Sequence, residues 1–423
     1  MNLKLTTSSL FLFGALASNI AFAELIHDFG HTGYFRIGAG LSEDEGPQEF
    51  FQAPGAGAKY RLGNENDWIE LDLYDTVRAA PDGPYVHVEL MAAFGGDQLD
   101  KIEFDDMVQV FLEAGDFSSV LGNPKVWIGQ RYYDRRDIHI NDFFYLNTLQ
   151  DFVGGGIRDM DLGFGKLAVA FGRQNADDDS ATPFDESGII QSRLDVRLSD
   201  IALSDNGSLT FWVGYDSSNG DSGNSVEALG GYGVGVIYTR KEFFGGFDHF
   251  VVQYGRGLGR HAGKGGLDDA VASVTSAAAR RAFDDAETFR IANVNLIEFS
   301  PNWSLMTSLV YEDTQAADFD DSDQTWSSLG IRPIWYLNDN FRIPVEIGWD
   351  RVKDNANDTD GALLKTTVAA EYALERGFWA RPVLRLFATY ANWSDEFRGR
   401  IGGDTYAEET TGWSVGVQAE TWW

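Results

Sequence analysis

The feature that most constrains the fold is a repeated alternation of apolar and polar residues in which the apolar side carries no charge. In 68–77, WIELDLYDTV, apolar residues occupy every second position from Ile69 to Leu73, with polar or aromatic residues between them. The same pattern recurs in 85–94 and 341–349. Successive side chains of a β-strand point to opposite faces of its sheet, so this period of two predicts strands with one apolar face.

Further strands of this kind are predicted along the whole chain. They cover 33–41, 57–63, 124–132, 159–173, 190–199, 208–215, 231–241, 249–256, 287–298, 303–312, 326–336, 362–373, 379–391 and 412–423.

Two architectures use such strands, a soluble β-sandwich and a membrane β-barrel. The barrel is favoured because the apolar faces are uncharged in strand after strand and aromatic residues recur at strand ends, including the terminal Trp423. The 47 Gly, 10 Pro and 14% aromatic residues fit many strands and turns. We therefore predict an all-β, antiparallel transmembrane barrel with roughly 16–18 strands and an aqueous lumen.

The first 23 residues, MNLKLTTSSLFLFGALASNIAFA, predict a secretory signal peptide. Lys4 supplies the charged start, and Ala21-Phe22-Ala23 supplies a cleavage site. The apolar run between them is too short to span a bilayer. We expect a signal peptide at 1–23 followed by one barrel domain at 24–423.

Charge and cysteine content exclude several classes of function. The formal net charge of −32 argues against nucleic acid or an anionic membrane surface as a partner. With no Cys, the exported chain has no disulfide, no thiolate nucleophile and no zinc site built on Cys.

The stretch 131–145, RYYDRRDIHINDFFY, combines charges with aromatic rings. A sugar ring presents hydroxyls that Arg and carboxylate groups bind and flat C–H faces that stack on aromatic rings. The alternative is an interface loop whose rings are buried and whose charges pair. The residues of this stretch alone leave both interpretations open.

Acidic and Gly-rich loops, which look extracellular, are predicted at 174–188, 216–228, 313–325, 352–361 and 394–410. A solvated acidic surface is favoured there, with opportunistic Ca²⁺ as the alternative, because DFDDSD from Asp318 lacks the glycine and glutamate spacing of an EF-hand. The Ala-rich stretch 267–287 predicts a short helix with Asp268 and Asp269 in its first turn.

Seven stretches, spread over the whole chain, resemble the maltoporins, trimeric sugar-specific porins of Gram-negative outer membranes. These stretches are TGYFRIG, KYRLGNE, RYYDRRDIHINDFFY, DMDLGFGKLAVA, GFDHFVVQYG, WARPVLRLFATYANW and VGVQAETWW. The resemblance implies an 18-stranded barrel, a homotrimer in the outer membrane, and an inward-folded constriction loop at 131–145. It also implies an oligosaccharide substrate, an aromatic path called the greasy slide, and no cofactor.

Matching the stretches residue by residue places the slide's rings at five positions. They are Tyr34, Trp68, Phe247, Trp379 and Trp422. The same matching places the polar partners at Arg36, Arg61 and Glu70, and the constriction residues at Arg135, Asp137, Asp142 and Phe144. Four of the rings share strand parity with polar neighbours, such as Tyr34 with Arg36, which favours sugar binding over a lipid-facing girdle. Trp423 has the opposite parity and is assigned to lipid.

The chain also departs from the family's pattern. Phe50 and the Asn66-Asp67 segment stand where the maltoporins have a short disulfide, and GGDQLDKIEFDDM lacks the tryptophan that the family sends into the neighbouring pore. Phe144 replaces a tyrosine and Arg136 replaces a histidine, which suggests an altered sugar preference.

The resulting hypothesis is facilitated diffusion of maltose, malto-oligosaccharides or related glucan oligomers. The alternative is a general diffusion porin that sorts solutes by size and charge. A glycosidase with Asp137 and Asp142 as its paired carboxylates is disfavoured, because neither residue lies in an apolar stretch that would raise its pKa. The six His are scattered in the sequence, and no GxSxG motif occurs, so a Ser-His-Asp site is unsupported.

Overall fold

The computed structural model describes residues 25–423 except 44–45, 97–100, 176–188, 221–226, 266–273, 316–322 and 356. The predicted signal peptide and the acidic stretch around Asp318 therefore lie outside the described residues or at their border.

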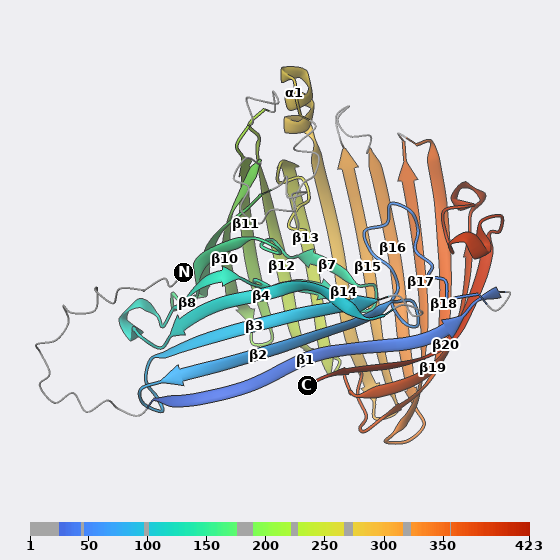
Figure 1. Ribbon diagram of the computed structural model, residues 1–423, viewed down its shortest axis with the longest axis horizontal. Helices are drawn as coiled ribbons and strands as arrows, with labels where there is room; N and C mark the ends of the chain where they lie inside the picture. Colours follow the sequence, from blue (N-terminus) through green and yellow to red (C-terminus); the bar gives the residue numbers. More distant parts are fainter. Residues whose placement is uncertain are drawn as a thin grey trace, which may run out of the picture.

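The described chain forms a closed antiparallel barrel of 18 strands (Figure 1). Closure occurs at β1, which pairs with β2 on one side and with β20 on the other. The wall strands are β1 (Ile26–Leu41), β2 (Asp67–Arg78), β3 (Tyr85–Gly96), β4 (Glu103–Gly115), β5 (Lys125–Gln130), β8 (Val153–Asp161), β9 (Lys166–Asn175), β10 (Ile190–Ser204), β11 (Gly207–Ser218), β12 (Gly230–Phe243), β13 (Gly246–Gly257), β14 (Glu287–Ser300), β15 (Trp303–Gln315), β16 (Gln324–Tyr336), β17 (Phe341–Asp354), β18 (Thr359–Ala373), β19 (Val383–Trp393) and β20 (Thr411–Trp422).

Short turns such as 205–206 and 244–245 join the strands at one end of the barrel, here called the turn end. Longer connections such as 258–286 and 394–410 join them at the other end, called the loop end. Helix α1 (Ala277–Asp285) stands above the loop end in Figure 1. None of the helices in the described ranges is long and apolar enough to cross a membrane.

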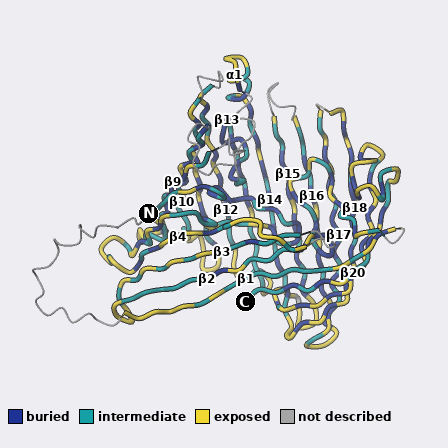
Figure 2. The backbone as a smooth tube through the Cα atoms, in the orientation of Figure 1, coloured by how far each residue is buried: buried dark blue, intermediate teal, exposed yellow. Residues whose placement is uncertain are grey.

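The wall has its apolar side outside and its polar side inside. Along β19, exposed and buried residues alternate throughout: Leu384, Leu386 and Tyr390 are exposed, whereas Arg385 and Thr389 are buried. Figure 2 shows this alternation along the neighbouring strands as well. A soluble sandwich buries its apolar faces, so the arrangement is that of a barrel that faces lipid.

Aromatic residues on the outer face mark a membrane boundary. Trp303 and Trp335 stack with centroids 5.9 Å apart at the turn end, and both are exposed. Trp423 is also exposed, and its indole N–H donates to His31 Nδ1 at 2.9 Å. The predicted outward direction of Trp423 is therefore confirmed, and the rings form the interfacial belt expected of such barrels.

Two segments from the loop end fold into the lumen. The first, 131–152, here called the inner loop, contains a small two-stranded sheet of β6 (Arg136–Ile138) and β7 (Phe143–Leu146). The second, 47–66, lies beside it. Two backbone hydrogen bonds join them: the Lys59 N–H donates to Asn141 O at 2.9 Å, and the Arg61 N–H donates to Ile140 O at 3.1 Å. Together they fill the side of the lumen next to β11–β18, so the constriction is held by the wall and by a second loop.

Several sequence predictions of local structure are wrong. The stretch 57–63 is not a wall strand: its alternation arises because it runs extended along the inner loop, with Tyr60 and Leu62 buried against the wall. The predicted strand 159–173 is a hairpin of β8 and β9, broken where Gly163 takes φ +83°. Strand β4 was missed because its sequence opens with the acidic EFDD.

Two further boundaries differ from the sequence predictions. Strand β19 begins at Val383 rather than at 379, because Pro382 has no N–H to donate to the sheet. Helix α1 begins at Ala277, where the Ser276 hydroxyl accepts the Ala279 N–H at 3.1 Å. Asp268 and Asp269, predicted for the first turn, lie outside the described residues.

Two facing glycines admit a side chain of the inner segment 47–66. Gly330 and Gly348 are direct partners across β16 and β17, and the ring of Tyr60 lies over both. A Cβ built on Gly348 would lie 1.9 Å from the Tyr60 ring. The Tyr60 hydroxyl is 2.9 Å from Ser328 Oγ, which fixes the ring in this slot.

We predict that Gly348→Val lowers the free energy of unfolding by about 1–3 kcal/mol, because the added side chain displaces the Tyr60 ring. Urea unfolding of the barrel in detergent measures this change. In a Tyr60→Ala background the same substitution should cost clearly less, and an equal cost in both backgrounds would contradict the slot.

Candidate functional site

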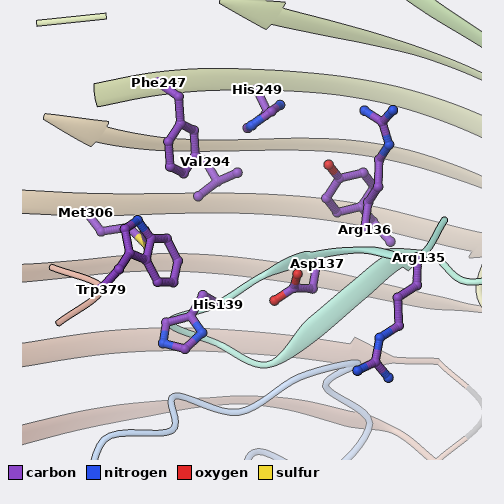
Figure 3. A pocket seen from close by; sticks show the side chains of 10 residues that line it. Arg135, Arg136, Asp137, His139, Phe247, His249, Val294, Met306 and Trp379 are labelled. Atoms are coloured by element: carbon purple, nitrogen blue, oxygen red, sulfur yellow. The ribbon is translucent and has the colours of Figure 1, made fainter. Parts of the chain in front are cut away.

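A cavity of about 360 Å³ lies inside the barrel, between the inner loop and the turn end (Figure 3). It is lined by Arg135, Arg136, Asp137, His139, Tyr145, Phe247, His249, Val294, Met306 and Trp379. Half of these residues belong to the inner loop and half to the wall and its turns. The cavity therefore lies in the lumen, between the inner loop and the opposite part of the wall.

The inner loop presents charges and rings together because of its hairpin. Asp142 turns the chain between β6 and β7 with φ +58°, which pairs Asp137 with Phe144. Arg135, just before β6, lies with its guanidinium carbon 3.7 Å from the Tyr132 ring centroid and 5.1 Å from that of Phe144. These cation–π contacts orient the guanidinium plane at the constriction.

Aromatic rings cluster where the inner loop approaches the turn end. The ring centroid of His139 lies 4.9 Å from that of Trp379 and 6.3 Å from that of Trp422, and the centroids of the two tryptophans are 6.4 Å apart. Burial, followed by the positive charges of Arg61 and Arg332, lowers the pKa of His139 well below its usual range, so this imidazole is neutral at pH 7. The three rings of the cluster are therefore uncharged, and the Arg61 guanidinium lies against them, 3.2 Å from His139 Nδ1.

Tyr34 lies at the centre of a hydrogen-bonded group of charges. Its hydroxyl donates to Glu420 Oε1 at 3.0 Å and accepts from Arg36 Nη1 and Arg61 Nη2, each at 2.9 Å. Both arginines also pair with Glu65, at 3.0 and 2.9 Å. The ring and its polar partners are thus held rigidly in the lumen.

The same group of charges reaches the last ring of the predicted slide. The guanidinium of Arg381 lies 4.2 Å from the Trp422 ring centroid and bonds Glu420 Oε2 at 2.8 Å. Tyr34 is directly opposite Trp422 across β1 and β20, so the two side chains lie on the same face of the sheet. That face is the lumen.

Trp68 and Glu70 form a separate group on β2, near the loop end. The indole N–H of Trp68 donates to Glu70 Oε1 at 3.1 Å, and the Tyr132 hydroxyl donates to the same oxygen at 3.4 Å. Glu70 is opposite Tyr34 across β1 and β2, so it also faces the lumen. This contact connects the wall to Tyr132, the residue whose ring lies against the Arg135 guanidinium.

A family model described as LamB porin matches residues 29–423. The chain belongs to the LamB porin family. The resemblance to the maltoporins is therefore confirmed, and the protein is a channel of the Gram-negative outer membrane.

Several solved structures of outer-membrane channels are similar to the chain. The chain is similar to OccAB1 of Acinetobacter baumannii, with 12% identity, 95% and 97% of the two chains covered and a TM-score of 0.48. It is also similar to DcaP of the same organism, with 12% identity, 93% and 97% covered and a TM-score of 0.47. A third is the anion-selective porin from Comamonas acidovorans, with 10% identity, 94% and 100% covered and a TM-score of 0.46.

In this LamB porin, the 12 predicted site residues fall into three groups. Arg135, Asp137, Phe247 and Trp379 line the cavity. Tyr34, Arg36, Arg61 and Trp422 belong to the network around Glu420. The other four lie apart from these: Trp68 and Glu70 stand near the loop end, the Phe144 ring contacts the Arg135 guanidinium, and Asp142 forms the hairpin turn. Within the described residues, ring contacts join Trp379 and Trp422, while Tyr34 and Trp68 have no ring neighbour.

The parity argument for Trp379 is wrong, because this residue precedes β19 and lies in the turn after β18. Trp379 reaches the lumen because that turn folds inward beside His139. The histidines are scattered in the sequence, but the fold brings two of them, His139 and His249, to one cavity. Their convergence depends on the inward loop, which no local pattern encodes.

Across the described ranges, no group of three or more His, Asp or Glu is arranged to hold a metal ion. Most of the DFDDSD stretch, where opportunistic Ca²⁺ was the alternative, lies among the residues that are not described.

Glu420 is the carboxylate that most of the network depends on, since it bonds Tyr34, Arg381 and Arg385. We predict that Glu420→Gln destabilises the barrel by about 3–5 kcal/mol, because it leaves buried guanidinium groups without a counter-charge. Equilibrium unfolding in urea measures the loss.

Asp360→Asn is the matched control, since it breaks an exposed pair with Arg351 on the outer face. It should leave stability unchanged. Equal effects of the two substitutions would show that the network does not hold the barrel.

Proposed function

We propose that this LamB porin conducts linear glucan oligosaccharides, such as maltose and malto-oligosaccharides, down their concentration gradient. The observation that carries the proposal is the composition of the cavity wall. Phe247 and Trp379 offer flat rings, while Arg135 and Asp137 on the inner loop offer hydrogen-bonding charges. Pyranose rings present matching surfaces, with C–H faces for the rings and hydroxyls for the charges.

The arrangement of the other rings supports passage in successive steps. Trp68 is near the loop end, Tyr34 is opposite Trp422 farther along the wall, and Trp379 and Phe247 lie towards the turn end. Each stacking contact is worth on the order of 0.5–1.5 kcal/mol. A sugar chain therefore exchanges one ring for the next without being trapped, and no energy source is required.

The neutral His139 supports the same mechanism. Its imidazole packs edge-on against both Trp379 and Trp422 and adds a third uncharged ring to the pair. The homotrimer implied by the family resemblance is part of the proposal. Light scattering of the detergent-solubilised protein tests it, with a mass of three chains as the expected result.

Planar-bilayer conductance tests the proposed function. We predict that maltotriose blocks the ion current in a saturable way and that Trp379→Ala raises the half-blocking concentration about 2- to 10-fold, by removing one stacking contact. Trp303→Ala removes a ring from the outer face and should leave the half-blocking concentration unchanged.

An absence of saturable block by maltose, maltotriose and laminari-oligosaccharides would contradict a sugar channel. Liposome swelling at equal solute concentration provides the second measurement. Equal entry of sugars and amino acids of like size would favour the general diffusion porin instead.

A further inference from the structure

Most arginines that face the lumen are neutralised by a carboxylate. Examples are Arg197 with Asp195 at 2.8 Å, Arg290 with Glu312 at 2.5 Å and Arg385 with Glu420 at 2.7 Å. Such pairing is expected, because a buried charge without a partner is costly. An unpaired guanidinium in the lumen therefore indicates a group that is available to a solute.

Arg135 and Arg136 are two such guanidinium groups. Within the described part of the chain, neither has a carboxylate oxygen within 4.0 Å. Arg135 is held instead by the faces of Tyr132 and Phe144, 3.7 and 5.1 Å from its guanidinium carbon. Contact with a ring face orients the plane of the guanidinium and leaves its N–H edges free to donate.

Arg136 extends from the inner loop in the opposite direction to Arg135 (Figure 3). Its polar neighbour is the buried Tyr145, a neutral side chain. Among the described residues, Asp137 is the one carboxylate that lines the cavity; its side chain points away from that of Arg136 (Figure 3) and lies among the charges of Arg61 and Arg135. Within the described residues, the Arg136 guanidinium therefore makes no ion pair, although Asp137 lines the same cavity.

The two arginines also line a second cavity of about 310 Å³ on the side of β8–β11. Two of its carboxylates are already paired, Asp159 with Lys125 and Asp200 with Lys166. The third, Asp134, is exposed and lies next to Arg135 in sequence. A solute that passes the inner loop therefore encounters Arg135 and Arg136 from either cavity.

We propose that Arg135 and Arg136 form an oxyanion-binding site, and that the sugars this channel passes best carry one anionic group, a carboxylate or a phosphate. The inference rests on the proposed function and names the substrate class. A guanidinium binds either oxyanion through two parallel N–H donors. The sugar ring beside that group then stacks on Trp379 or Phe247, which line the same cavity as both arginines. The chain's overall charge of −32 does not prevent this, since charges beyond about 8 Å are screened at physiological ionic strength.

The test compares sugars that differ only in charge, as blockers of the ion current in planar bilayers. The carboxylate pair is maltotrionate against maltotriitol, and the phosphate pair is maltose 1-phosphate against maltose. In 0.1 M KCl we expect the anionic member of at least one pair to block at about a tenfold lower concentration than the neutral member. A tenfold change is what the binding free energy of one charge-assisted hydrogen bond provides. The pair with the larger ratio identifies the source of the oxyanion.

Substitutions locate the effect. Arg136→Gln should reduce the anionic-to-neutral ratio to about 2 or less, and Arg136→Lys should keep part of it, because a lysine retains the charge but not the paired donors. Arg351→Gln removes an exposed charge from the outer face and should retain the full ratio.

Equal block by both members of both pairs in the unsubstituted protein overturns the inference while leaving the sugar channel intact. An unchanged ratio in a folded Arg136→Gln channel also overturns it. Failure of every sugar to block, neutral ones included, instead refutes the proposed function. If Arg136→Gln does not fold, the comparison in the unsubstituted protein still decides.

Discussion

Every backbone N–H and C=O of a membrane-spanning strand must find its partner within the protein, because hydrocarbon offers none. The closed ladder from β1 through β20 and back to β1 meets this demand. Closure also defines an inside, and the strict alternation of each strand then places polar side chains there. The position of the site follows from this constraint, since residues of β1, β2 and β20 face the same lumen.

The polar interior creates a second demand, because charges that leave water need partners. The wall meets it with ion pairs, many of which share a carboxylate, as Arg342 and Arg385 share Glu371. The inner loop lies against this paired wall; its Arg131 pairs with Glu113, whereas Arg135 and Arg136 make no ion pair within the described residues. A rigid, neutralised wall and an exposed constriction are what a selective channel requires, since only the constriction then discriminates between solutes.

The barrel could be predicted from the sequence because the alternation of apolar and polar residues along each strand is a local pattern. Lipid requires that pattern, since every outward side chain of a wall strand must be apolar. The sequence could not predict the fate of 57–63, whose extended conformation mimics a wall strand while its partners, Asn141 and Ile140, lie in another loop. Trp379 shows the same limit: its lumenal position comes from an inward turn, whereas the parity argument assumed a strand. The unpaired state of Arg135 and Arg136 was equally out of reach, because ion pairing depends on which strands meet across the lumen.

If sugars pass through this lumen, its rings and charges must bind them in succession. A cryo-EM structure of the protein with maltohexaose tests it most directly. We expect sugar density against Trp379 and Phe247, with hydroxyls within hydrogen-bonding distance of Arg135 and Asp137. Density confined to the outside of the barrel, or an empty lumen at saturating sugar, would contradict it.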